Sequence, residues 1–247
     1  MGRLIETLAL EAGHSIAAIV DPLAAEFKKD KQVFDSIDDF VKANLKIDAA
    51  IEFTHPDKAA DNIKLLAKEK IPVVCGTTGW YSKLPEISDF VNAAGTSLFW
   101  APNFSLGMNL FYRLAEYAAE IFDPFAEYDA GGFEIHHNKK ADSPSGTAKA
   151  IAEKMLNKMK RKKKAVYETL NRPPAADELH FASMRAGFVP GTHTIVFDSA
   201  ADSIEITHSL RNRNGLASGT IKAAEWLCSQ KRTGVFTMDD MLVDILG

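Results

Sequence analysis

The sequence predicts a two-domain fold, in which a parallel α/β sheet with helices on both faces precedes a smaller α+β domain with a mostly antiparallel sheet. Short apolar segments alternate with amphipathic helical segments up to residue 104, the pattern of parallel strands joined by helices. After residue 105 several segments alternate apolar and polar residues one by one, as in a sheet with one solvated face. We therefore assign residues 1–104 and 213–247 to the first domain and residues 105–212 to the second.

The first domain opens with a predicted helix over 2–12, which Gly13 ends. A short apolar strand over 15–20 follows and ends at Asp21. The remaining predicted elements are a helix over 36–44, a strand over 48–53, a helix over 56–70, a strand over 72–75, a helix over 83–94 and a strand over 97–100.

The expected ligand site of this domain lies beyond the carboxyl ends of its strands, where ligands of doubly wound sheets bind. Small, polar or kinked residues follow those ends: Asp21, Thr54, His55, Gly76–Gly79 and Ala101–Phe104. In the dinucleotide fingerprint the last glycine opens a helix, and an acidic residue about 20 positions later binds the ribose hydroxyls. Gly2 and Asp21 have this separation. The pair alone is not specific, so the regular alternation of strands and helices carries the nucleotide assignment.

The chain as given begins inside this glycine-rich turn, without the strand and the two earlier glycines of the fingerprint. The first strand of a doubly wound sheet normally lies at its centre, and unpaired buried backbone groups cost about 1 to 3 kcal/mol each. We therefore expect the central position of the sheet to be empty or filled by another segment, and we expect the missing strand to be encoded upstream of Met1.

The second domain is predicted to begin with a helix over 106–122 and to contain a further helix over 147–159. Antiparallel strands are predicted over 180–185, 193–199 and 204–210. A last helix over 216–229 and the segment 237–246 are predicted to pack back on the first domain.

The stretch from Glu134 to Thr147 has the strongest chemical signature in the chain. A strand-like segment leads into two histidines and two lysines, and a Pro-Ser-Gly turn then opens a helix at Thr147. Helix N-termini attract anions through free backbone N–H groups, and nearby imidazole and ammonium groups add positive charge and transferable protons. The stretch therefore predicts a site for a carboxylate or a phosphate with a proton donor beside it. Asp142 could orient a donor or cap the turn.

Composition narrows the class of protein. The chain has 247 residues, 46% of them hydrophobic, and a net charge of −4, so no overall basic field would attract nucleic acid. We expect no membrane partner and a cytoplasmic location, because the apolar runs are short and no signal-peptide pattern opens the chain. The two cysteines, Cys75 and Cys228, lie far apart, as suits a reducing compartment.

Individual residues allow two alternative chemistries. Cys75 precedes a loop and could act as a thiolate nucleophile, although a cysteine after two valines is more often a small buried apolar residue. His136 and His137 could bind a metal, but adjacent residues of an extended segment point to opposite sides and no Glu-x-x-His spacing follows. We predict no metal site.

The stretch from Glu134 to Ala148, Glu-Ile-His-His-x-x-Lys-x-Asp-Ser-Pro-Ser-Gly-Thr-Ala, resembles the signature of the 4-hydroxy-tetrahydrodipicolinate reductase (dihydrodipicolinate reductase) family. The resemblance covers nearly the whole chain. It extends to Met1-Gly2-Arg3, Cys75–Trp80, Ala101–Ser105, Gly191–His193 and Glu205–His208.

This resemblance implies a Rossmann-like nucleotide domain and an α+β domain that binds substrate and assembles homotetramers. The family reduces 4-hydroxy-tetrahydrodipicolinate (dihydrodipicolinate) to tetrahydrodipicolinate with NADH or NADPH, in lysine and diaminopimelate synthesis. By position, His136 and Lys140 would be the catalytic proton donors, and His137, Lys140, Gly146 and Thr147 would bind a small dicarboxylate substrate. The implied cofactor-binding residues are Gly2, Arg3, Asp21, Gly76, Thr77, Thr78, Ala101, Pro102, Asn103 and Phe104.

Asp21 favours NADH, because a carboxylate that accepts ribose hydroxyls repels a 2′-phosphate and no arginine follows it. Two rival functions remain open. One is another Rossmann oxidoreductase that acts through Cys75, and the other is a non-enzymatic nucleotide-binding or sensor relative.

Overall fold

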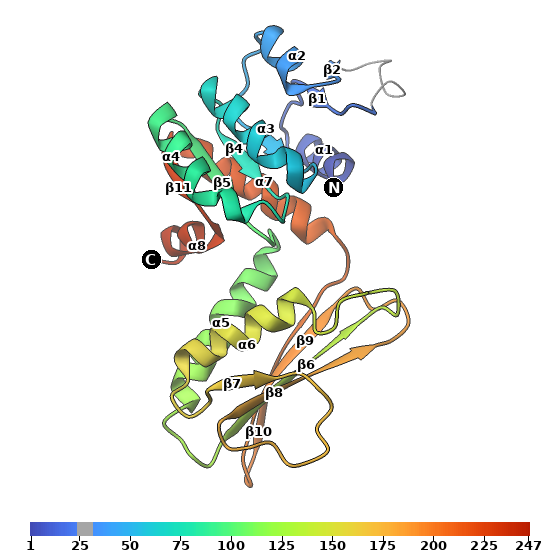
Figure 1. The fold of residues 1–247 in the computed structure, drawn as a ribbon, viewed down its shortest axis with the longest axis vertical. Helices are drawn as coiled ribbons and strands as arrows, with labels where there is room; N and C mark the ends of the chain where they lie inside the picture. Colours follow the sequence, from blue (N-terminus) through green and yellow to red (C-terminus); the bar gives the residue numbers. More distant parts are fainter. Residues whose placement is uncertain (24–31) are drawn as a thin grey trace. The chain divides into compact units, whose positions relative to one another are not determined.

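The structure, a computed structural model, describes residues 1–23 and 32–247 and divides into two compact units (Figure 1). The first unit comprises Met1–Leu106 and Asn214–Gly247, and the second comprises Gly107–Arg213. Each unit has its own sheet and its own apolar core.

The first unit contains a parallel sheet with strand order β11-β5-β4-β3. Its strands are β3 (Ala50–Glu52), β4 (Val73–Cys75), β5 (Ser97–Trp100) and β11 (Gly234–Phe236). β4 and most of β5 are buried, as apolar strands of parallel sheets are. Because the strands are parallel, the carboxyl ends of β3, β4 and β5 meet at one edge, where the sequence predicts the ligand-binding residues.

Helices precede, join and follow the strands of this unit. They are α1 (Gly2–Glu11), α2 (Ile37–Lys42), α3 (Pro56–Lys68), α4 (Leu84–Ala94), α7 (Asn214–Ser229) and α8 (Met238–Leu246), with a 3-10 turn, η2 (Tyr81–Lys83), before α4. Local signals in the sequence set their ends. Ser36 caps α2 by accepting the N–H of Asp39 at 3.2 Å, and Gly95 ends α4 with the left-handed conformation that glycine adopts without strain.

A separate two-stranded sheet in the first unit pairs β1 (Ile19–Val20) with β2 (Val33–Phe34) in parallel. Within residues 1–23 and 32–247, no strand joins this pair to the four-stranded sheet. The division agrees with the expectation of a sheet that lacks its central strand. The helix before β1, α1, packs on α7 through a buried apolar cluster of Ile5, Ala9, Ala217 and Ile221.

The second unit is a five-stranded sheet with strand order β10-β9-β6-β8-β7. Its strands are β6 (Asp129–His136), β7 (Lys164–Val166), β8 (Glu178–Arg185), β9 (Thr192–Asp198) and β10 (Ser203–Ser209). β9 pairs antiparallel with both β10 and β6, whereas β8 pairs parallel with both β6 and β7. The sheet is therefore mixed, and the antiparallel prediction was wrong for β8. A single strand's alternation gives its period but not the direction of its neighbour.

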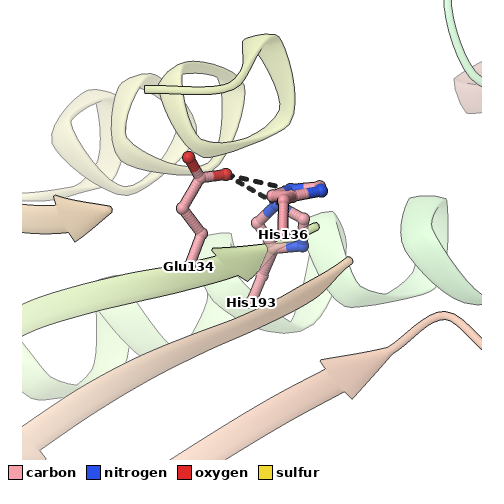
Figure 2. Close-up of side chains that lie close together, drawn as sticks. All are labelled: Glu134, His136 and His193. Carbon is pink, nitrogen blue, oxygen red and sulfur yellow. Dashed lines mark hydrogen bonds and ion pairs between the residues drawn. The ribbon is translucent and has the colours of Figure 1, made fainter. Parts of the chain in front are cut away.

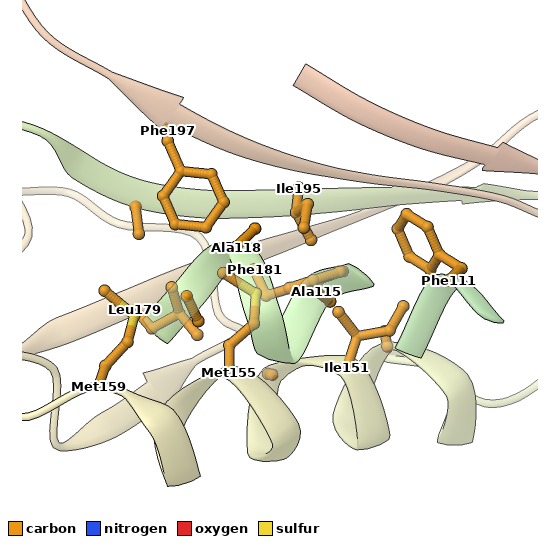
Figure 3. Packing of buried hydrophobic residues seen from close by; sticks show 14 of the residues in the cluster. Phe111, Ala115, Ala118, Ile151, Met155, Met159, Leu179, Phe181, Ile195 and Phe197 are labelled. Atoms are coloured by element: carbon orange, nitrogen blue, oxygen red, sulfur yellow. The ribbon is translucent and has the colours of Figure 1, made fainter. Parts of the chain in front are cut away.

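Two helices, α5 (Leu106–Phe122) and α6 (Gly146–Lys158), pack on one face of this sheet (Figure 3). Phe181, Ile195 and Phe197 are fully buried from the strand side, and Ile151 and Met155 are fully buried from α6. Each such side chain contributes about 1.5 to 3 kcal/mol of burial free energy. This core holds β6 and α6, and thus both ends of the Glu134–Thr147 stretch.

The prediction missed β2, β7 and β11, and it made β1 too long. Strands of two or three residues have no measurable period, and β2, β7 and β11 lack the run of consecutive buried residues that made β4 readable.

Candidate functional site

The side chains of Glu134 and His136 on strand β6 lie on the same face of the sheet, because side chains two positions apart on a strand point the same way. His193 of β9 lies opposite Glu134 in the antiparallel register. The loop after His136 ends at Ser145, whose hydroxyl accepts the N–H of Ala148 at 3.0 Å and caps α6. A carboxylate, two imidazoles and a helix N-terminus therefore meet within the second unit.

The three side chains on the strands form a buried cluster (Figure 2). Oε2 of Glu134 lies 3.1 Å from Nε2 of His136 and 3.3 Å from Nε2 of His193. The two Nε2 atoms are 3.4 Å apart, and the rings meet edge to face. Glu134 is completely buried, and His136 and His193 expose only 8% and 3% of their surface.

Glu134 accepts hydrogen bonds from three further residues. Its Oε1 accepts the backbone N–H of Ser145 at 2.9 Å, the hydroxyl of Ser183 at 2.9 Å and the guanidinium of Arg185 at 3.0 Å. Its Oε2 also accepts the hydroxyl of Ser145. Arg185 in turn donates to the carbonyl of Asp142 at 2.6 Å. One carboxylate thus connects β6, β8, β9, the loop and the N-terminus of α6.

These contacts decide the ionisation of the cluster. Burial would raise the pKa of Glu134, but hydrogen bonds from His193, Ser145 and Arg185 outweigh it and hold the pKa well below its ordinary value. The pKa of His136 is lowered, chiefly by burial; Glu134 opposes that shift, while His193, Lys140 and Arg185 add to it. Glu134 is therefore ionised at neutral pH.

Lys140 and Asp142 are paired in the loop, with Nζ of Lys140 2.7 Å from Oδ1 of Asp142. The backbone N–H of Gly146 also donates to Asp142. Hydrogen bonding to Lys140 is the largest cause that lowers the pKa of Asp142. Asp142 thus both holds a predicted proton donor and contacts the first turn of α6, which combines the two roles that the sequence left open.

The other residues proposed for the substrate lie on the same loop and helix start. His137 is half-buried, and its carbonyl accepts the N–H of Lys140 at 3.1 Å. Gly146 is exposed, and a Cβ built on it would meet nothing within 4 Å. The Thr147 side chain hydrogen-bonds with Tyr112 of α5.

Gly191 keeps space for the His136 ring. It has φ +153°, and a Cβ built on it would lie 2.8 Å from Cε1 and 3.2 Å from Nδ1 of His136. Any side chain at this position would push the imidazole.

In the first unit, the residues predicted to bind the cofactor follow the carboxyl ends of β4 and β5. The hydroxyl of Thr77 donates to the buried carboxylate of Glu52 at 2.6 Å and accepts the N–H of Thr54 at 2.7 Å. Gly76 lies so close to Phe53 that a Cβ would be 2.1 Å from the ring. Thr78 is exposed on the same turn.

The segment Ala101–Phe104 follows β5 at the same edge. Ala101 donates its N–H to the carbonyl of Cys75 at 3.3 Å, and Asn103 accepts the N–H of Ser105 at 2.9 Å. Pro102 is exposed and Phe104 is buried. The structure therefore brings the segments after β4 and β5 together.

Gly2, Arg3 and Asp21 lie on α1 and after β1. Gly2 is the first residue of α1, whose N-cap, Met1, makes no side-chain hydrogen bond to the helix. An uncapped helix N-terminus suits a pyrophosphate group, because its N–H groups point at the ligand. Asp21 follows β1 and accepts the N–H of Leu23 at 2.9 Å. The cofactor role of these three residues stays a prediction.

Cys75 does not fit the nucleophile hypothesis. Its side chain is completely buried, and its thiol donates to Glu52 at 3.2 Å. Burial, followed by the charge of Glu52, raises the pKa of the Cys75 thiol far above its ordinary value. A thiolate therefore does not form there at neutral pH.

The Glu134, His136 and His193 atoms also lie close enough together to face one metal ion, within 4.8 Å of one another. Arg185 and Ser145 already donate to this carboxylate, which favours a hydrogen-bonded cluster over a cation. The sequence argument against a metal treated only the adjacent pair His136 and His137, and it overlooked the alternate positions on β6.

Sequence reasoning assigned no role to Glu134, His193 or Arg185. The i and i+2 spacing of Glu134 and His136 was a readable signal that they share a face. His193 and Arg185 come from other strands, and only the register reveals their positions.

Two family models match this chain. Residues 1–104 match the N-terminus of dihydrodipicolinate reductase, and residues 107–242 match its C-terminus. Among residues 1–23 and 32–247, no helix is both long and apolar enough to cross a membrane.

Curated relatives align with this chain over nearly its full length. A 4-hydroxy-tetrahydrodipicolinate reductase of Christiangramia forsetii is 36% identical over 99% of this chain and 95% of its own length. One of Archaeoglobus fulgidus is 34% identical over 98% of this chain and 95% of its own length.

Solved structures support the fold. The dipicolinate-bound dihydrodipicolinate reductase from Paenisporosarcina sp. TG-14 gives a TM-score of 0.78 at 22% identity, covering 96% of this chain and 92% of that one. An amine dehydrogenase from Mycobacterium smegmatis gives a TM-score of 0.57 at 10% identity, covering 95% of this chain and 91% of that one. With both halves matched by the family models and full-length relatives above one-third identity, this chain belongs to the dihydrodipicolinate reductase family.

Proposed function

We propose that this chain reduces 4-hydroxy-tetrahydrodipicolinate to tetrahydrodipicolinate with a reduced nicotinamide dinucleotide. The observation that carries the proposal is the His136 cluster beside Lys140 and the capped start of α6, in a chain whose two halves match the family. The curated relatives are named for this reaction.

The second unit would bind the substrate carboxylates. Lys140 supplies a positive charge, Gly146 and Thr147 supply N–H groups at the start of α6, and His137 lies on the loop before them. The Asp142 carboxylate accepts hydrogen bonds from the Lys140 ammonium group and from the N–H of Gly146. A substrate carboxylate would therefore compete with Asp142 for these two donors.

His136 and Lys140 would supply the proton that completes the reduction. The dinucleotide supplies a hydride when it is bound. The hydroxyl group of 4-hydroxy-tetrahydrodipicolinate would leave as water, which gives the conjugated imine that accepts the hydride. The ammonium group of Lys140 would lower the barrier as negative charge develops on the imine, and Lys140 or protonated His136 would then give the proton that completes the reduction.

The first unit would bind the dinucleotide through residues at one edge of its parallel strands: Gly2, Arg3, Asp21, Gly76, Thr77, Thr78, Ala101, Pro102, Asn103 and Phe104. We propose NADH as the preferred form, because the Asp21 carboxylate would bind ribose hydroxyls and repel a 2′-phosphate.

We further propose a homotetramer that uses the face of the second unit's sheet opposite α5 and α6. Phe133 and Met184 lie on that face with 37% and 51% of their surface exposed, on the paired strands β6 and β8, where Phe133 is opposite Ala182 and Met184 is opposite Ile135. Light scattering on the purified chain should give four times its mass of 27.1 kDa, and Met184→Asp should reduce the assembly size. A monomeric wild-type chain would contradict this assembly.

A cytoplasmic location is also proposed, since both cysteines are free thiols and a reducing compartment keeps them so.

The direct test of the function is turnover. The purified chain should oxidise NADH only when the dicarboxylate is supplied, with a higher kcat/KM for NADH than for NADPH. A chain that binds NADH in calorimetry but never oxidises it would instead support the non-enzymatic reading.

A further inference from the structure

The carboxylate of Glu52 lies at the carboxyl end of β3 with 4% of the residue exposed, and it has no part in the reaction as outlined. We propose that Glu52 is a positioning residue for the dinucleotide, which holds Gly76 and Thr77 so that the turn after β4 presents the exposed Thr78 to the cofactor. This inference rests on the proposed function for the identity of the ligand, whereas the hold of Glu52 on the turn stands without it.

The first observation is the set of groups around the carboxylate. Oε1 accepts hydrogen bonds from the hydroxyl of Thr54 and from Nδ2 of Asn62, the latter at 3.2 Å. Oε2 accepts the hydroxyl of Thr77 at 2.6 Å and the thiol of Cys75 at 3.2 Å. All four partners donate, and a carboxylate only accepts and has room for four such bonds. Glu52 therefore joins the segments at the ends of β3 and β4 to α3.

Glu52 holds the turn after β4 at two consecutive residues. Its backbone carbonyl accepts the N–H of Gly76 at 2.9 Å, and its side chain accepts the hydroxyl of Thr77. The Thr77 hydroxyl also accepts the N–H of Thr54 at 2.7 Å, and the Thr77 carbonyl accepts the indole N–H of Trp80 at 2.8 Å. A hydroxyl has one hydrogen, and Glu52 receives the one of Thr77. The N–H of Gly76 and the side chain of Thr77 are thus engaged within the protein.

Among the side chains of this turn, that of Thr78 is the one open to a ligand. Thr77 exposes 6% of its surface, whereas Thr78 is exposed. Gly79 follows with φ +85°, in the left-handed region, and a Cβ built on it would lie 3.3 Å from Pro56. Thr78 thus lies between a buried residue tied to Glu52 and a glycine in a conformation that side chains rarely adopt. The side chain of Thr77 would therefore serve the cofactor through the shape of the turn.

A turn that is already fixed binds a ligand more tightly, because less conformational entropy is lost on binding. Thr77→Val keeps the volume of the side chain but leaves the N–H of Thr54 without its acceptor and Glu52 without one of its donors. The turn should then loosen at Gly76, although the Glu52 carbonyl that accepts the N–H of Gly76 is still present.

The experiment compares Thr77→Val and Thr77→Ser with wild type. Thr77→Val should raise the calorimetric Kd for NADH about tenfold, and the KM for NADH by a similar factor. Thr77→Ser keeps the hydroxyl and should restore both. Amide hydrogen exchange without ligand should be faster at Gly76 in Thr77→Val than in wild type or Thr77→Ser.

Thr96→Val is the matched control in the same unit. It removes a buried hydroxyl that has no hydrogen-bond partner among residues 1–23 and 32–247. Thr96 precedes β5, at the end of the strands opposite the turn. Thr96→Val should change neither the affinity for NADH nor the exchange at Gly76.

A second set of variants tests Glu52 itself. Glu52→Ala should weaken NADH binding at least as much as Thr77→Val does. The double variant should bind NADH no more weakly than Glu52→Ala, because the hydroxyl acts through the carboxylate. Effects that add in the double variant would show that Thr77 contacts the cofactor directly and would overturn the proposal.

The Thr77 variants decide the matter alone if Glu52→Ala does not fold. Wild-type affinity for NADH in Thr77→Val would overturn the proposal, and so would weaker binding with unchanged exchange at Gly76. A wild-type chain that binds no NADH would contradict the proposed function and remove the cofactor role. Faster exchange at Gly76 in Thr77→Val would even then support the link between Glu52 and the turn.

Discussion

Replacing Gly191 by alanine tests whether the exact place of the His136 ring matters. The new Cβ would lie 2.8 Å from Cε1, whereas ordinary contacts begin at about 3.4 Å, so the ring must move by roughly 0.6 Å. A misplacement near 1 Å can cost about 100-fold in rate, so we expect kcat to fall about 10- to 100-fold. NADH affinity should be unchanged, because the predicted cofactor residues lie in the other unit.

Gly191→Ala also strains the backbone, since φ is +153°. This strain costs about 1 to 3 kcal/mol and should lower Tm by roughly 2 to 4 °C per kcal/mol. Gly187→Ala is the matched control, because Gly187 has φ +49° but a Cβ there meets nothing within 4 Å. It should lose stability and keep kcat. Steady-state kinetics and thermal unfolding measure both effects. Equal losses of kcat in the two variants, or wild-type kcat in Gly191→Ala, would refute the reasoning.

Three further predictions concern individual side chains. His136→Ala and Lys140→Ala should each lower kcat about 100- to 10,000-fold while calorimetry shows retained NADH binding; full turnover in both variants would remove them from the mechanism. Cys75→Ser should keep reductase activity, since the buried thiol is protonated and takes no part in the chemistry, and loss of activity in a variant that melts like wild type would revive the thiolate hypothesis. The folded pKa of Glu134 is lowered, so its stabilising contribution is complete above the unfolded value of about 4.3 and is lost as pH falls toward the folded value. The difference in urea midpoint between wild type and Glu134→Gln should therefore shrink below about pH 4, and a difference independent of pH would contradict the low pKa.

Helices and strands with a clear hydrophobic period, or with a clear signal at one end, could be predicted from the sequence. The helix that starts at Pro56, the helix capped by Ser36 and the strand Ser97–Trp100 were predictable because their local residues determine them. The parallel pairing of β8 with β6 was not, because no local residue records which strand lies alongside.

In the candidate site too, residues that are neighbours in sequence could be predicted, whereas residues contributed by other strands could not. His136, Lys140, Gly146 and Thr147 are neighbours in sequence, and their chemistry was readable as a cationic loop before a helix. The buried partners of His136 come from three strands, so the role of Glu134 and His193 appears only once the register of the sheet is known. For Cys75, the valines before it indicated the buried thiol that the structure shows.

The most direct test of the central claim follows the hydrogen that is transferred. The chain should be incubated with the dicarboxylate substrate and with NADH that carries deuterium at nicotinamide C4, and the product should be examined by mass spectrometry. The proposed function predicts tetrahydrodipicolinate that carries one deuterium from the cofactor with wild type, and little product with Lys140→Ala. Unchanged substrate with folded, NADH-binding wild type would contradict the account.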